Sequence, residues 1–186
     1  MKALKEKDFS IEFLRECFYV EFKEGVLIWK SRPESHFVSY NAMSAFNGKN
    51  FGRIVGSLSG HRYIVVRLSL PAGGQAVLYA HRIIWALHTG AWPSNLIDHE
   101  DGNRSSNGID NLRSATKSQN VANAGPRANN KCGAKGVYLV KSTGRYAAEI
   151  KVNGKRTRLG TFDTIQQASE AYFERAKIVF GEFAHA

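Results

Sequence analysis

The sequence predicts an α+β fold, and three observations support this. Short β-branched and aromatic runs over 26–79 are separated by glycines, which is typical of antiparallel strands. Thr-x-x-Gln capping boxes at Thr116 and Thr164 each predict the start of a helix. An Asn-Gly turn at 153–154 between two extended runs indicates a β-hairpin. We expect four segments: a β-rich platform over 1–80, a ββα core over 81–125, a linker over 126–132, and a small three-stranded antiparallel sheet packed on one helix over 133–186.

Composition narrows the functional classes. The 186 residues include 26 Lys plus Arg against 16 Asp plus Glu, a net charge of +10. The hydrophobic share of 43% is enough for a packed core and excludes global disorder. No apolar run approaches the ~20 residues of a membrane span, and the charged start leads into no signal core. The basic surplus indicates a polyanionic partner, either nucleic acid or an anionic membrane.

Two cysteines and the order of elements add further expectations. Cys17 and Cys132 lie far apart, which fits neither a disulfide framework nor a zinc cluster and favours a reduced, cytoplasmic location. Helical spacing over 8–24 predicts a helix capped by Asp8 or Ser10. The polar stretch 31–52 predicts a long loop. Expected strands cover 26–29, 63–68 and 76–79.

The middle block carries the residues suited to chemistry. Leu96-Ile97 predicts a short strand leading into Asp98 and His99, and Leu112-Arg113 predicts a returning strand. The capping box at Thr116 places Asn120 in the first turn or so of the next helix. Asp98 and Asn120 offer hard oxygen ligands, which suit Mg²⁺ better than Zn²⁺. A histidine with a pKa of about 6.5 can take a proton from water at neutral pH. These parts suffice for phosphodiester hydrolysis.

The middle block contains the signature His81-Arg82…Trp85, Ile97-Asp98-His99…Asp101-Gly102-Asn103, Asn111-Leu112-Arg113 and Gln119-Asn120. With this signature, residues 81–123 resemble the HNH nucleases, in the subgroup common among phage homing endonucleases. The resemblance implies His99 as general base, Asn111 as the residue that ties the loop, and Asp98 with Asn120 as ligands of a divalent metal, Mg²⁺ first with Mn²⁺ as a substitute. The third family position is often His but is Asn120 here, which argues against a Zn²⁺ site.

The C-terminal block predicts a cationic sheet face. With the turn at 153–154, Lys151 lies opposite Arg156 and Glu149 opposite Arg158, and all four side chains project from one face. Glu149 is expected to pair with Arg158. A helix beginning after Thr164 would cover the other face.

A second signature in the sequence consists of Gly136-Val137, Arg145-Tyr-Ala-Ala-Glu-Ile150, Arg158-Leu-Gly-Thr-Phe-Asp163, Ala168, Ala171-Tyr172, Ala176 and Gly181. With this signature, residues 133–184 resemble the plant Apetala-two/ethylene-response-factor DNA-binding domain, whose three-stranded sheet lies in the major groove. The resemblance implies that five strand positions contact DNA, namely Arg145, Glu149, Lys151, Arg156 and Arg158. Tyr138 and Thr143 stand where that family usually has Arg and Trp, so the plant base preference does not carry over.

Together these patterns predict a metal-dependent endonuclease acting on double-stranded DNA, as a monomer or homodimer, phage-encoded and located in the bacterial cytoplasm. Arg82 and Arg113 are added as candidate DNA contacts. Whether the platform over 1–80 also contacts DNA or is purely structural stays open. The alternative function is a DNA-binding regulator with an inactive nuclease core. A membrane-surface role ranks last, because no cationic helix has a large apolar face.

Overall fold

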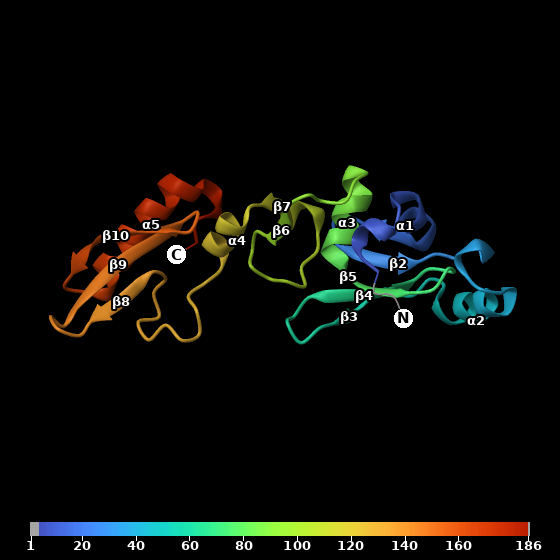
Figure 1. Cartoon of the computed structure of the whole chain (residues 1–186), viewed down its shortest axis with the longest axis horizontal. Coiled ribbons are helices and arrows are strands. Elements are labelled where there is room, and N and C mark those ends of the chain that lie inside the picture. Colours follow the sequence, from blue (N-terminus) through green and yellow to red (C-terminus); the bar gives the residue numbers. More distant parts are fainter. Residues whose placement is uncertain (1–3, 186) are drawn as a thin grey trace. The chain divides into compact units, whose positions relative to one another are not determined.

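The computed structural model describes residues 4–185, which form two compact units with the boundary between Ser114 and Ala115. We call them the N-terminal unit and the C-terminal unit. Both mix helices with small sheets, as the sequence predicts (Figure 1). The predicted limits of a platform, a nuclease core and a linker remain predictions. No helix in the described part of the chain is long and apolar enough to cross a membrane.

The N-terminal unit contains three two- or three-stranded sheets and three α-helices among its described residues. β1 pairs with β2, β3-β4-β5 form a sheet in that order, and β6 pairs with β7. Three short 3₁₀ turns cover Glu6–Asp8, Glu34–His36 and Ile109–Asn111. The helices and strands are α1 (Ile11–Cys17), β1 (Phe18–Glu21), β2 (Val26–Trp29), α2 (Tyr40–Asn50), β3 (Ser57–Leu58), β4 (Ile64–Ser69), β5 (Gln75–Tyr79), α3 (Ala80–Thr89), β6 (Leu96–His99) and β7 (Leu112–Ala115).

The first helix is shorter than the predicted segment 8–24. It begins after Ser10, whose hydroxyl accepts a hydrogen bond from the Phe13 backbone, and it ends at Cys17. The chain then becomes strand β1, in which Phe18 lies opposite Trp29 of β2 with the ring centroids 4.8 Å apart. Aromatic and β-branched residues pack well in strands, and this cross-strand pair outweighs the helical spacing of the apolar residues.

The predicted loop over 31–52 was wrong in part, because it contains helix α2. Ser39 caps the helix by accepting a hydrogen bond from the Ala42 backbone. No residue of α2 is buried, so the helix has no apolar stripe that periodicity could reveal. Only its N-cap residue was available in the sequence as a signal.

The core of the N-terminal unit forms around α3. Ile83, Ile84 and Ala86 on this helix are fully buried. They belong to one apolar cluster with residues of α1, β1, β2, β4, β5, β6 and β7. The indole of Trp92, which follows α3, donates a hydrogen bond to the carbonyl of Phe9. The helix that precedes β6 is therefore anchored from several sides.

The C-terminal unit is a three-stranded antiparallel sheet packed on a helix. The strand order is β10-β9-β8, and a bulge lies between Arg158 and Gly160. Lys151 lies opposite Arg156 and Glu149 opposite Arg158, which is the predicted register. The capping box of Thr116 and Gln119 is formed in full. The elements are α4 (Lys117–Asn123), β8 (Val137–Val140), β9 (Arg145–Val152), β10 (Lys155–Phe162), α5 (Ile165–Phe180) and the 3₁₀ turn Gly181–Phe183.

Candidate functional site

The candidate site lies at the end of β6, where Asp98 and His99 follow one another. Both residues are buried, with exposed fractions of 5% and 4%. Ile97 before them is part of the apolar core, which fixes the strand end that carries the two polar side chains. Buried polar groups of this kind need partners.

The Asp98 carboxylate has an arginine partner on the neighbouring strand. The Arg113 Nε donates to Asp98 Oδ2 over 3.1 Å, and the two side chains are only 13% and 6% exposed. The guanidinium of Arg113 thus forms an ion pair inside the unit, and the predicted contact of Arg113 with DNA stays a prediction. This ion pair compensates the buried negative charge of Asp98.

His99 is held by a carboxamide that the sequence analysis did not single out. The His99 Nε2 lies 3.1 Å from Asn107 Oδ1, and Asn107 is 2% exposed. The sequence assigned no role to Asn107, because nothing in the spacing shows which way its carboxamide points. Asn107 is therefore a site residue that only the structure reveals.

Aromatic rings surround the imidazole on another side. The His81 ring meets the His99 ring edge to face, with centroids 4.9 Å apart, and the Tyr63 ring lies 6.1 Å from His99. Tyr79 stacks on His81 at 5.5 Å. The guanidinium of Arg104 lies 5.2 Å from the Tyr63 ring. The cluster of aromatic rings around His99 therefore has a positive charge, that of Arg104, beside the Tyr63 ring.

His81 is a neutral ring in these surroundings. Burial, together with the smaller effects of the charges of His99 and Arg82, lowers its pKa from 6.5 to about 3. Its Nδ1 is buried and has no hydrogen-bond partner within the described residues. The His81 ring lies between the rings of Tyr79 and His99.

Asn111 fastens the loop between β6 and β7. Its Nδ2 donates to Asp101 Oδ1 over 3.0 Å and to the Ser106 carbonyl over 2.8 Å, while its Oδ1 accepts from the Asp101 backbone over 3.0 Å. Its own carbonyl accepts from the Glu100 backbone over 2.9 Å. One side chain thus joins the two ends of the loop.

The predicted metal ligands lie in different units. Asp98 lies on β6 in the N-terminal unit, and Asn120 lies on α4 in the C-terminal unit. An aspartate carboxylate is the donor type that hard cations such as Mg²⁺ prefer, so Asp98 fits the expected ion. Within residues 4–185 no group of three or more His, Cys, Asp or Glu side chains gathers to hold a metal. The ligand roles of Asp98 and Asn120 remain predictions.

The predicted DNA contact Arg82 is also engaged within the N-terminal unit. Its Nε and Nη2 donate to the Glu6 carboxylate over 2.5 and 2.9 Å. It also donates to the carbonyls of Asn95 and Pro93 over 3.0 and 3.1 Å. These bonds tie α3 to the chain segments on either side of it, so a DNA contact by Arg82 stays a prediction.

The predicted cationic face of the C-terminal sheet has its own ion pairs. Glu149 pairs with Arg156 at 3.4 Å, not with Arg158 as expected. The Arg158 Nη2 instead donates to Thr161 Oγ1 over 2.7 Å, since the bulge after Arg158 changes the local geometry. Arg145 pairs with Asp163 at 2.8 Å, and Lys151 is exposed.

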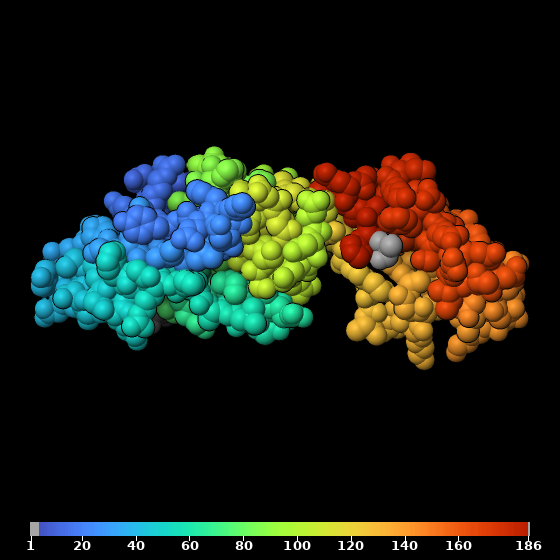
Figure 2. Space-filling model, turned by 180° about the vertical axis from the view of Figure 1, so that it is seen from behind, coloured from blue at the N-terminus to red at the C-terminus, as the bar shows by residue number. Residues whose placement is uncertain are grey.

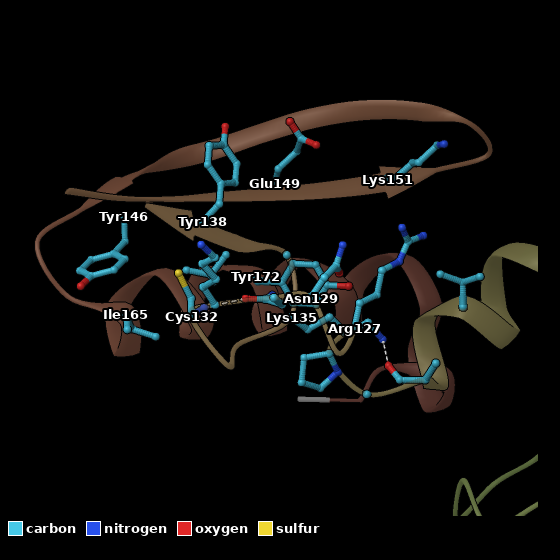
Figure 3. Close-up of a pocket in the computed structure, with 18 of the residues that line it drawn as sticks. Arg127, Asn129, Cys132, Lys135, Tyr138, Tyr146, Glu149, Lys151, Ile165 and Tyr172 are labelled. Atoms are coloured by element: carbon cyan, nitrogen blue, oxygen red, sulfur yellow. Dashed lines mark hydrogen bonds between the residues drawn. The ribbon is translucent and has the colours of Figure 1, made fainter. Parts of the chain in front are cut away.

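A cavity of about 940 Å³ adjoins this sheet (Figure 3). The segment 124–136 lines one side, and residues of β8, β9 and α5 line the other. The Lys135 Nζ donates to the carbonyls of Ala122 and Ala124 at the end of α4, and burial lowers its pKa to about 8. Lys151 and Arg156 also line the cavity, so it opens beside the cationic strand residues.

The part of the chain that contains β6, β7 and the loop between them is similar to known proteins. Residues 78–122 match the sequence model of the HNH endonuclease family. This stretch contains Asp98, His99, Asn107 and Asn111. The predicted HNH nuclease domain is thereby confirmed. The match does not extend to the C-terminal sheet.

One relative shares more of the chain. Over 106 residues the sequence is 37% identical to an uncharacterized HNH endonuclease of Acanthamoeba polyphaga mimivirus. The shared region is 56% of this chain and 54% of that protein, so the chain spans about half the length of the relative it matches. No solved structure matches the chain.

Proposed function

We propose that the protein is an endonuclease that hydrolyses phosphodiester bonds in double-stranded DNA with the help of a divalent metal ion. The observation that carries this proposal is the buried His99, which is oriented by Asn107 and follows Asp98 directly within the HNH-matching residues. A fixed imidazole beside a buried carboxylate is suited to proton transfer near a cation.

In the proposed reaction His99 removes a proton from the attacking water. The water oxygen then forms a bond to phosphorus, and the bond between phosphorus and one sugar oxygen breaks. Asn111 keeps the loop in shape through its bonds to Asp101 and Ser106, so that His99 meets the water in one geometry. Asp98 and Asn120 would hold the cation, with Mg²⁺ first and Mn²⁺ as a substitute. The cation supplies stabilisation of the charge that develops on the phosphate oxygens.

The C-terminal sheet is proposed to hold the duplex. Arg145, Lys151, Arg156 and Arg158 lie on adjacent strands β9 and β10, and the side chains of Arg145 and Arg156 are 47% and 70% exposed. Arg and Lys side chains in this arrangement can contact phosphates and guanine edges. Arg82 and Arg113 are proposed to contact phosphates as well, and each also has a carboxylate partner in the N-terminal unit.

The biological setting is proposed from the sequence patterns alone. We propose a phage or mobile-element homing endonuclease that works in the bacterial cytoplasm. With one such centre per chain, a monomer would nick one strand, and double-strand cleavage would require a homodimer or two successive events.

The test is cleavage of supercoiled plasmid by the full chain with Mg²⁺, with Mn²⁺ and with EDTA. We expect nicking with either metal and none with EDTA. His99→Ala should keep DNA binding, measured by gel shift, and lose about 10²- to 10⁴-fold in cleavage rate, as removal of a general base does. The control is His61→Ala, an exposed histidine. Full cleavage by His99→Ala contradicts the assignment, and binding without cleavage by the wild type supports the alternative DNA-binding regulator.

A further inference from the structure

We propose that Asn107 sets the tautomer of His99, so that Nε2 carries the hydrogen and Nδ1 is the nitrogen that accepts the proton. We also propose that the turn between β1 and β2 holds Asn107 in place. The statement that Nδ1 accepts a proton during cleavage rests on the proposed function. The tautomer of His99 and the support of Asn107 by the turn do not depend on that function.

The contact between the two side chains decides the tautomer. Asn107 Oδ1 lies 3.1 Å from His99 Nε2, and both residues are at least nine-tenths buried. A carboxamide oxygen can only accept a hydrogen bond, so Nε2 must carry the hydrogen. With the hydrogen on Nδ1, two lone pairs would face each other away from water, which costs about 1–3 kcal/mol. A neutral imidazole has one hydrogen, and its other nitrogen is the acceptor.

The turn between β1 and β2 lies tightly against the backbone that carries Asn107. Gly25 has a φ of +68°, and a Cβ there would lie 2.1 Å from the Asn107 carbonyl carbon and 2.3 Å from the Gly108 nitrogen. A Cβ on Gly108 would lie 2.5 Å from the Lys23 carbonyl oxygen. Real Cβ atoms do not approach backbone this closely, so both positions need glycine.

A hydrogen bond completes this attachment. The Ile109 backbone donates to the Phe22 carbonyl over 2.8 Å. Figure 2 shows the blue N-terminal segment directly beside the yellow-green segment of the loop. Two glycine contacts and one hydrogen bond therefore fix residues 107–109 from outside the loop, while Asn111 fixes the loop from within. The hairpin of β1 and β2 thus positions a residue that orients His99.

Two substitutions of Asn107 separate the effect of its hydrogen bond to His99 from the effect of its packing. Asn107→Asp keeps the shape and places a carboxylate oxygen, which can only accept, opposite Nε2. Asn107→Ala removes the acceptor. Asp should therefore preserve the Nε2–H tautomer, whereas Ala should allow both tautomers.

The direct measurement is the tautomer of His99 in the full chain labelled with ¹⁵N-histidine. Two-bond ¹⁵N–¹H spectra at a pH where the ring is neutral distinguish a protonated nitrogen from an acceptor nitrogen, and His99→Ala assigns the signals. We expect Nε2–H in the wild type and in Asn107→Asp, and a mixture in Asn107→Ala. An Nδ1–H ring in the wild type, or an unchanged ring in Asn107→Ala, overturns the proposal.

Cleavage kinetics supply the second readout. Asn107→Ala should lower kcat by about 10- to 100-fold with KM for DNA unchanged, because loss of an orienting partner affects the reacting state. Asn107→Asp should recover most of this loss. An equal loss in Asp and Ala would mean that packing, not hydrogen bonding, is what Asn107 supplies. If the wild type does not cleave at all, the proposed function fails while the spectra still decide the tautomer.

The supporting role of the turn is tested by Gly25→Ala against Gly52→Ala. Gly52 has a similar φ of +75°, but nothing lies within 4 Å of the position of its Cβ. Both variants carry the same backbone strain, and only Gly25→Ala pushes on Asn107. We expect the His99 signals to change as in Asn107→Ala only for Gly25→Ala. Unchanged signals in a folded Gly25→Ala would refute the supporting role, and should this variant not fold, Asn107→Ala still tests the tautomer.

Discussion

His81 and His99 meet edge to face, with their ring centroids 4.9 Å apart and their planes inclined by 71°. His81 comes from the first turn of α3 and His99 from the end of β6, so the contact joins the helix to the strand that carries the site. Because His81 is 4% exposed and stacked by Tyr79, its ring restricts the positions that the His99 ring can take.

The first prediction concerns the pH dependence of stability that His81 causes. In the fold its pKa is about 3, against 6.5 ordinarily, with burial as the main cause and the charges of His99 and Arg82 adding to it. Below its ordinary pKa the unfolded chain binds a proton that the folded chain does not bind, so this contribution to stability is full above 6.5 and falls as the pH decreases towards 3. At pH 5 the loss should reach about 2 kcal/mol.

The measurement is urea unfolding of wild type and His81→Phe at pH 7 and pH 5. His81→Phe keeps an aromatic ring among Tyr63, Tyr79 and His99, and it should lose less stability between the two pH values. His61→Gln, at an exposed histidine, is the control and should behave as the wild type does. Equal losses in wild type and His81→Phe would show that His81 does not titrate in this way.

The second prediction concerns the buried ion pair of Arg113 and Asp98. Removing one partner of a buried pair leaves an uncompensated charge, so Arg113→Leu should lower the free energy of unfolding by about 3 kcal/mol. Adding Asp98→Asn should recover part of that loss, because the charge is then gone as well. The coupling is obtained from urea unfolding of the two single variants and the double variant. Additive losses would mean that the 3.1 Å contact contributes no coupling energy.

The sequence predicted features that local residues determine. The register of Lys151 against Arg156 follows from an Asn-Gly turn and strict alternation, and it is correct. The helix after Thr116 follows from its capping box. Helix α2 was missed because none of its residues is buried, so no periodic apolar pattern marks it.

The residue types of the candidate site could be predicted from the sequence, but the contacts that hold these residues could not. His99 and Asn111 were identified from the motif, and the structure adds how the loop holds them. Asn107 depends on Gly25, which lies more than eighty positions earlier in the chain. Such a contact is a property of the folded backbone, and no local pattern encodes it. The pairing of Glu149 with Arg156 depends likewise on a bulge that alternation alone does not reveal.

The third prediction concerns DNA binding by the C-terminal sheet. Arg156→Ala with Arg158→Ala removes two positive charges from β10. If both contact phosphates, affinity should fall and the slope of log K against log salt should become shallower by about 2. The matched control is Arg175→Ala with Lys177→Ala, which removes the same charge from exposed positions of α5. An equal change of slope in both double variants would indicate a general charge effect and exclude this surface as the specific contact.

The fourth prediction concerns the packing of β8 on α5. Gly136 has a φ of +70°, and a Cβ there would lie 2.3 Å from the Tyr172 ring and 2.6 Å from the Glu149 carbonyl oxygen. Gly133 has nearly the same φ, +69°, with nothing within 4 Å of its Cβ position. Gly133→Ala should therefore show the cost of a left-handed backbone alone, about 1–2 kcal/mol.

Gly136→Ala should show that same cost and an additional loss, because Tyr172 is buried on α5 and cannot move without opening the core. Overpacking of this kind costs about 1–3 kcal/mol more. Thermal or urea unfolding of the two variants measures the difference directly, since the backbone term is common to both. Equal stabilities of Gly133→Ala and Gly136→Ala would mean that the backbone at Gly136 can move away from Tyr172 at no cost. The cationic strands would then lack the rigid support from α5 that a DNA-binding face requires.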